Sequence, residues 1–198
     1  MKKLFAAAIV LASASLAMAQ VETKAYVGQG GPLPDVSSSR FEIFVPDHGS
    51  IVDIKAVDLL IDHTFIGDLV ITLVKKGEPG TPPVASVVLM DRPGVPPGTF
   101  GNGSDFAGLY SFVPGFPPVP ESGSPAVLPP GAYGLHEGGD YGAFRNIDKF
   151  GLWSLHITDN AGGDVGTLHS WRIVMNNIPE PTSLSLLALA GLGLIRRR

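Results

Sequence analysis

The sequence predicts an all-β domain, folded as a β-sandwich or jelly roll. Apolar residues alternate with polar ones in several short runs, which is the period of a half-buried strand. Glycine and proline punctuate these runs, as 25 and 18 of the 198 residues respectively. Between the two chain ends, no stretch shows the 3.6-residue apolar period of an amphipathic helix. Together these features are typical of many short strands joined by turns.

The first expected strands lie between residues 41 and 61. Phe41, Ile43 and Val45 alternate, and Pro46–Gly49 supplies a turn. The apolar stretch Ile51–Ile61 changes face near Ala56-Val57, so either a β-bulge or a strand buried on both faces is expected there.

Four further strands are expected, two before and two after the centre of the chain. Leu69, Ile71 and Leu73 alternate, the turn region 75–83 follows, and residues 84–90 form a β-branched run. Near the C-terminus the alternating sets begin at Trp153 and at Trp171, with a Gly-rich turn between them. Each tryptophan offers a large apolar surface and one N–H group that needs an acceptor.

The central segment 93–131 contains ten prolines and eight glycines. Because proline has no backbone donor for a sheet, this segment is expected to be a long surface loop, with one edge strand around residues 106–112. A Pro-rich ligand for an aromatic groove is the alternative interpretation.

Both chain ends resemble targeting signals. Residues 1–19 combine Lys2 and Lys3, an apolar run and small residues before Gln20, which is the pattern of a secretory signal peptide cleaved by signal peptidase. Residues 177–198 contain a Pro-Glu-Pro tripeptide, an apolar run of 12 residues and a basic cluster; the signal residues are Pro179, Glu180, Pro181, Arg196, Arg197 and Arg198.

The C-terminal pattern closely resembles the PEP-CTERM sorting signal of Gram-negative bacteria. The resemblance implies transient insertion in the inner membrane, processing by exosortase, and export to the cell surface or extracellular matrix in an exopolysaccharide or biofilm context. The apolar run, at about 1.5 Å per residue, is too short for the ~30 Å hydrocarbon core. A simple tail anchor is the alternative.

Charge and cysteine content limit the classes of partner. Without both signals, 9 of the 14 basic residues and 17 of the 18 acidic residues remain, giving a formal charge of −8. This acidic body argues against nucleic acid as a partner. The chain has no cysteine, which excludes disulfides and thiolate metal sites.

Four ordered motifs between residues 27 and 176 resemble the P domain, or P/Homo B domain, of proprotein convertases. They are Ile61–Leu73 with its Gly-Asp-Leu, Val88–Arg92, Gly151–Asn160, and Gly163–Trp171. The resemblance implies a jelly-roll β-sandwich of about eight strands, interrupted here by the Pro/Gly-rich central loop. In the convertases this domain accompanies a subtilisin-like protease, for which this chain is expected to have no room.

No catalytic arrangement is expected. The sequence contains five histidines that could act as a base, but it has no Gly-x-Ser-x-Gly motif to supply a serine nucleophile. His63 is expected to be a structural residue at a strand end. Glu121 and Glu137 are the most suggestive pair for glycoside cleavage, but the sequence offers them no evident partner.

Calcium is the candidate cofactor, although the sequence establishes none. Calcium takes 6–8 oxygen ligands with flexible geometry, and the candidate ligands are Asp68, Asp91, Asp159, Asn160 and Asp164. Asx-turn capping by the same side chains is the alternative. Gly67 is expected to supply a positive φ at its bend, and Asp68 to accept hydrogen bonds from backbone amides there.

The sequence therefore favours a non-catalytic, exported protein that binds a surface protein, an extracellular polysaccharide or another matrix component. The alternative is an accessory domain that stabilises or assists a separate subtilisin-like serine protease. That alternative rests on resemblance of fold alone.

Overall fold

The structure is a computed structural model that describes residues 20–123 and 126–179. The signal peptide at 1–19 lies outside the described residues. So does the sorting signal from Glu180 onward, including Pro181 and Arg196–Arg198, so that Pro179 is its last described proline. The described strands belong to one compact unit.

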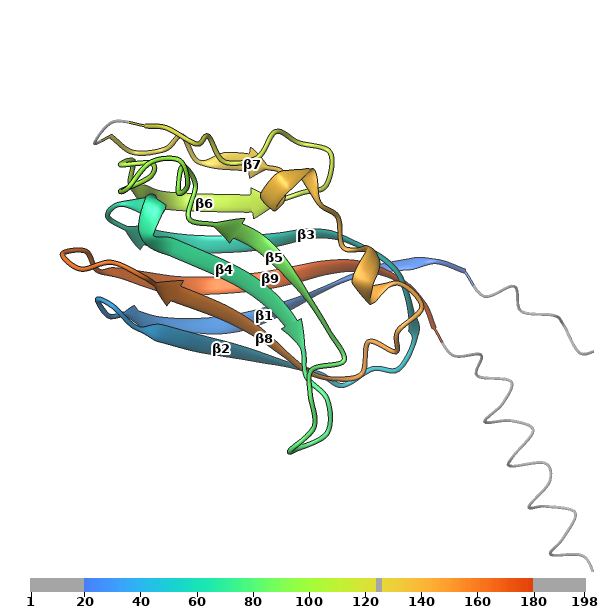
Figure 1. The fold of residues 1–198 in the computed structure, drawn as a ribbon. Coiled ribbons are helices and arrows are strands. Elements are labelled where there is room, and N and C mark those ends of the chain that lie inside the picture. Colours follow the sequence, from blue (N-terminus) through green and yellow to red (C-terminus); the bar gives the residue numbers. More distant parts are fainter. Residues whose placement is uncertain (1–19, 124–125, 180–198) are drawn as a thin grey trace, which may run out of the picture. The chain divides into compact units, whose positions relative to one another are not determined.

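Within the described residues, nine strands form two sheets that lie as two layers (Figure 1). The five-stranded sheet has the order β1-β9-β3-β6-β7, and the four-stranded sheet has the order β2-β8-β4-β5. All neighbouring strands are antiparallel except β6 and β7. The strands are β1 (Glu22–Leu33), β2 (Ser38–Val45), β3 (Ser50–His63), β4 (Leu69–Lys75), β5 (Ala85–Asp91), β6 (Phe106–Phe112), β7 (Gly131–Tyr133), β8 (Gly151–Asp159) and β9 (Gly166–Ile178).

The all-β sandwich prediction is confirmed, and one more strand is present than the expected eight or so. The alternating residues face a common core: Leu69, Ile71 and Leu73 of β4 are fully buried, as are Trp153 and Leu155 of β8. The Trp153 indole Nε1 donates to the Lys149 carbonyl at 2.9 Å. The N–H group of Trp171 is buried and has no partner among the described residues.

Strand β1 was not among the strands predicted from the sequence, and glycines lie within it. A Cβ on Gly30 would lie 1.7 Å from the Leu168 carbonyl oxygen, and one on Gly28 would lie 2.4 Å from the Trp171 Nε1 atom. The glycines therefore let β1 pack closely against β9 and its tryptophan. Here glycine marks close backbone approach rather than a turn.

The long strand β3 contains the irregularity expected near Ala56-Val57. Its register against β9 shifts between Ile54 and Ala56, and also at two other places. Ile51, Ile54, Val57 and Leu59 are all buried, so the shifts keep apolar residues on the core face.

The strand expected at the edge in the Pro-rich segment lies inside the sheet instead. β6 pairs with β3 over seven residues and with the short strand β7 on its other side. The Tyr110 hydroxyl donates to the Leu128 carbonyl at 2.6 Å, and the Tyr141 hydroxyl donates to the Phe112 carbonyl at 2.9 Å. These bonds hold the loop segments against β6, so the centre of the chain adds to the sheet.

Helical structure in the described residues is limited to the 3-10 turns η1 (Ile66–Asp68), η2 (His136–Gly138) and η3 (Gly142–Phe144). No helix among residues 20–123 and 126–179 is long and apolar enough to cross a membrane.

Candidate functional site

Several predicted site residues lie at one end of the four-stranded sheet, where β4 begins and β8 ends. We call this the strand-end corner and define it as His63, Asp68, Arg92, Asp159 and Asp164. The His63 Nε2 atom lies 3.5 Å from the Asp159 Oδ2 atom, and both side chains are buried. The Arg92 Nη2 atom lies 3.9 Å from the Asp68 Oδ1 atom.

The backbone of the corner is shaped by its close packing. The positive φ expected at Gly67 occurs instead at Phe65, whose φ is 59°. Gly67 is required for space, because its Cβ would lie 2.6 Å from the Phe100 carbonyl oxygen and 2.7 Å from the Asn102 amide nitrogen. The expected position of the positive φ was therefore wrong, although the need for glycine was correct.

Burial raises the pKa of Asp68, and the nearby carboxylates of Asp159 and Asp164 raise it further. Arg92 and His63 oppose this effect but do not cancel it. The Asp68 carboxylate faces Arg92, and the described structure shows no backbone amide that donates to it. The corner therefore holds a partly compensated excess of negative charge.

The structure brings together only some of the calcium candidates. Asp159 caps its own turn, accepting a hydrogen bond from the Ala161 amide at 3.2 Å, and the Asn160 side-chain amide donates to the Asp68 carbonyl at 3.0 Å. Asp91 is exposed and lines a different pocket.

As placed, these residues do not fit a calcium ion. In the part of the chain that the structure describes, no three His, Asp or Glu side chains are grouped so that they could hold one metal ion. In addition, Arg92 and His63 already approach two of the carboxylates. Calcium binding therefore stays a prediction from the sequence.

The other histidines are placed in two different ways. His48 pairs with Asp148 at 2.7 Å, His136 lies 3.9 Å from Glu137, and His169 pairs with Asp62. His156 is half-buried, and its Nε2 atom has no hydrogen-bond partner in the described structure.

Glu121 and Glu137, which had no evident partner in the sequence, line one pocket together with Asp91 and His136. The pocket has a volume of about 90 Å³. Ligand-binding pockets usually measure roughly 300–1,000 Å³, so this pocket is too small to enclose a sugar. The Glu121 carboxylate also accepts a hydrogen bond from the Gly94 amide, which gives it a structural role.

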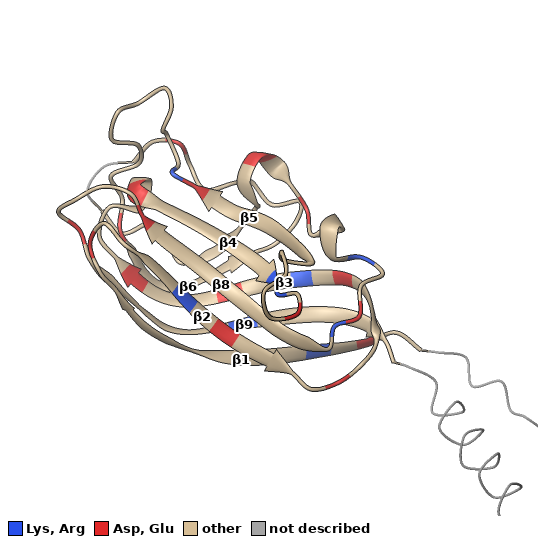
Figure 2. Cartoon of the chain, turned by 60° about the horizontal axis from the view of Figure 1, so that its bottom comes forward, with Lys and Arg blue, Asp and Glu red and all other residues tan. Residues whose placement is uncertain are grey.

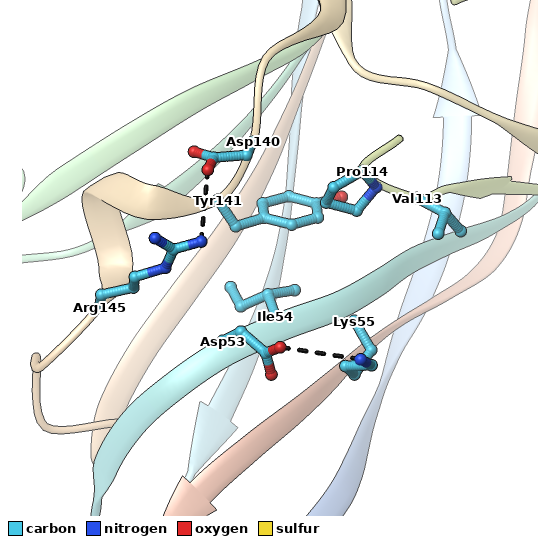
Figure 3. Close-up of a pocket in the computed structure, with 8 residues that line it drawn as sticks. All are labelled: Asp53, Ile54, Lys55, Val113, Pro114, Asp140, Tyr141 and Arg145. Carbon is cyan, nitrogen blue, oxygen red and sulfur yellow. Dashed lines mark hydrogen bonds and ion pairs between the residues drawn. The ribbon is translucent and has the colours of Figure 1, made fainter. Parts of the chain in front are cut away.

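A second pocket, of about 190 Å³, lies between β3 and the segment that contains η3 (Figure 3). Figure 3 shows the Tyr141 ring reaching toward Pro114, with two ion pairs at the rim. The Arg145 Nη2 atom lies 3.3 Å from the Asp140 Oδ2 atom, and the Lys55 Nζ atom lies 3.7 Å from the Asp53 Oδ2 atom. Because both cations already have carboxylate partners, this pocket offers no free charge to a ligand.

A larger pocket, of about 440 Å³, lies on the outer face of the four-stranded sheet. We call it the cationic pocket and define it by Arg40, Lys76 and His156, with the loop 77–83 at its rim. Its basic residues come from β2, the end of β4 and β8. Figure 2 shows Lys and Arg as separate segments along the chain rather than one continuous run. These residues are far apart in the sequence, and only strand pairing brings them to one pocket.

Comparisons with known proteins match the tail and the sandwich separately. A family model of the PEP-CTERM protein-sorting motif matches residues 177–198, so the chain carries this motif and is an exported protein sorted by exosortase. Two proteins named calcium-dependent protease, from Nostoc sp. and Trichormus variabilis, are each 27% identical over 145 residues, covering 73% of this chain.

The chain spans only 17% of the length of these two relatives. Among solved structures, a serine protease of Aeromonas sobria in complex with a chaperone has a TM-score of 0.42 and 17% identity, covering 81% of this chain and 28% of that one. The same protease without the chaperone has a TM-score of 0.42 and 16% identity, covering 80% and 27%. These values do not show that the chain belongs to a protease family.

Proposed function

We propose that the mature chain is a non-catalytic binding protein that is displayed at the cell surface. Its signal peptide at 1–19 is removed by signal peptidase, and its tail is processed by exosortase near Pro179. The P/Homo B-like sandwich that is left holds a surface protein or an extracellular matrix component. The match of residues 177–198 to the sorting motif supports the route of export.

One observation carries the non-catalytic part of this proposal. Four of the five histidines lie beside a carboxylate, and none of these four is hydrogen-bonded to a serine or threonine hydroxyl in the described structure; the pairs are His48–Asp148, His63–Asp159, His136–Glu137 and His169–Asp62. A serine hydrolase needs its histidine beside the nucleophile, with the carboxylate on the far side of the ring. These pairs supply only the carboxylate half of that arrangement.

Processing is tested by mass spectrometry of the protein recovered from its native surface or medium. We expect an N-terminus at Gln20 and loss of Arg196–Arg198. A mature protein that retains an intact Arg198 would reject tail removal and favour permanent anchoring.

A second candidate function is an accessory role toward a separate subtilisin-like serine protease. It is favoured by the 145-residue similarity to two calcium-dependent proteases, since this similarity covers a small part of each of them. Affinity capture of the mature chain from its native secretome discriminates between the two functions. Recovery with a serine protease favours the accessory role, and recovery with polysaccharide or another surface component favours the binding protein.

A further inference from the structure

The cationic pocket combines residues from three adjacent strands of one sheet. In the register of the sheet, Arg40 of β2 stands opposite His156 of β8, and His156 stands opposite Thr72 of β4. Lys76 directly follows β4, and the loop 77–83 forms the rim with Pro79, Thr81 and Pro83. The volume of about 440 Å³ lies within the usual range for small-molecule sites.

The charges in the pocket are only partly compensated. The Arg40 side chain makes no hydrogen bond or ion pair with any residue in 20–123 or 126–179, whereas the Lys76 Nζ atom lies 4.0 Å from the Glu42 Oε1 atom. The Nε2 atom of His156 is buried without a hydrogen-bond partner among the same residues. The Arg40 guanidinium is therefore available to a ligand, whereas the imidazole nitrogen is covered by the protein.

The surroundings of His156 show that the local field is positive. Burial lowers the pKa of His156, and the charges of Arg40 and Lys76 lower it further, against a smaller opposite effect of Glu42. Glu78, the remaining acidic residue of the pocket, is exposed on the rim loop. A negatively charged group beside His156 would relieve this unfavourable environment.

We propose that the cationic pocket binds a small ligand through one carboxylate group, as found in a sugar acid. Arg40 supplies the ion pair, and Lys76 adds a second positive charge. This inference deepens the proposed function and rests on it, because it names the chemistry that a surface-displayed binding protein would recognise.

A carboxylate fits this arrangement better than a dianion such as phosphate. The planar guanidinium matches the two oxygens of a carboxylate. Glu42 lies beside Lys76, so Arg40 is the cation of the pocket without an ion pair among the described residues. With Glu78 on the rim, the two acidic and two basic side chains of the pocket carry no net formal charge, so a dianion would add more unbalanced negative charge than one carboxylate. The carboxylate also makes protonation of His156 easier, so that binding takes up a proton.

The experiment compares two sugars that differ only at C6: galacturonate, which carries a carboxylate, and galactose, which does not. Each is titrated into the chain of residues 20–178, which contains both complete sheets, by calorimetry at pH 6 and pH 8. We expect galacturonate to bind at least about tenfold more tightly than galactose, and more tightly at pH 6 than at pH 8. Equal binding of the two sugars, or no binding of galacturonate, overturns the proposal.

Single substitutions test whether galacturonate binds in the cationic pocket. Arg40→Ala is expected to weaken galacturonate binding by about tenfold or more, and His156→Gln to remove its pH dependence. Arg145→Ala, which removes an exposed arginine from the pocket beside η3, is the matched control and leaves binding unchanged. Thermal unfolding of each variant checks that it is folded.

Two further results bear on the assignment. Inorganic phosphate that binds as tightly as galacturonate, or more tightly, overturns the choice of a carboxylate. A failure of galacturonate to bind, while the mature chain still captures its surface partner, refutes this inference alone. Hydrolysis of a substrate by the purified chain refutes the proposed function, whatever the sugar titration shows.

Discussion

The strand-end corner and the cationic pocket both concentrate charged side chains on the four-stranded sheet, but they do so in opposite ways. In the corner the carboxylates of Asp68 and Asp159 are buried, and Arg92 and His63 lie against them. In the pocket Arg40 is exposed and has no counterion in the described structure. The residues that belong to sequence motifs therefore stabilise the fold, whereas the residue that is available to bind a ligand lies outside these motifs. Substitutions in the two regions should therefore act on different quantities.

The largest expected effect on stability is in the corner backbone. Gly67→Ala places a Cβ against two backbone atoms that cannot move away cheaply. We expect the free energy of unfolding, measured by urea denaturation, to fall by about 3 kcal/mol. Gly80→Ala, in the rim loop where a Cβ would meet nothing within 4 Å, is the control. It is expected to cost about 1 kcal/mol, because of its positive φ.

The next largest effect is expected from Asp159→Ala. The substitution leaves His63 buried without its carboxylate and leaves the Ala161 amide without its acceptor. Loss of one partner from a buried polar contact costs about 2–3 kcal/mol. A loss below about 0.5 kcal/mol in the same urea experiment would show that the corner is not held together by this contact.

A smaller effect of opposite sign is expected from Asp68→Asn. Because the pKa of Asp68 is raised above its ordinary value of 3.8, its proton stabilises the folded state below the unfolded pKa. This stability is lost as the pH rises through the folded pKa. The variant should therefore be more stable than the wild type at pH 7, and the gap should close as the pH falls toward 4. A variant that is less stable at pH 7 would show that the Arg92 contact outweighs burial.

Calcium is expected to change stability little, because Arg92 and His63 already approach two of the corner carboxylates. At about 5 mM calcium chloride we expect the melting temperature to move by less than about 2 °C, which corresponds to weak or no binding to the folded state. A rise of more than about 5 °C that disappears in Asp164→Asn would restore the sequence-based calcium site and contradict the framework role of the corner.

The smallest effect on stability is expected in the cationic pocket. Arg40 is exposed and without an ion pair in the described residues, so Arg40→Ala should leave the free energy of unfolding within about 0.5 kcal/mol. The same substitution is expected to weaken galacturonate binding by about tenfold. An Arg40→Ala protein that unfolds much more easily would break the comparison, since it would make Arg40 part of the framework.

The sequence predicted the strands whose residues alternate and missed those in which packing overrides propensity. The alternating residues of β2, β4, β8 and β9 have the expected burial. Strand β1 was not predicted, and its Gly28 and Gly30 make room for β9 rather than forming a turn. β6 was expected to be an edge strand because the segment around it is rich in proline, whereas the three-residue strand β7 covers its outer side.

The candidate site was predictable only where its residues are close in sequence. Asp159 and Asn160 were found from one motif. Asp159 accepts a hydrogen bond from the Ala161 amide, as the capping interpretation expects, whereas the Asn160 side-chain amide donates to the Asp68 carbonyl. Arg40, Lys76 and His156 are far apart in the chain, and only the pairing of β2, β8 and β4 brings them to one pocket. Glu121 and Glu137 came together for the same reason, through loop packing that no local pattern indicates.

The central claim is that the mature chain is a non-catalytic binding protein, and one assay tests this claim directly. The purified chain of residues 20–178 is incubated with peptide, ester and glycoside substrates, with and without a serine-directed fluorophosphonate. The account predicts no turnover above the buffer blank and no labelling by the fluorophosphonate. Turnover that co-purifies with the protein and is abolished by the fluorophosphonate would contradict the non-catalytic claim.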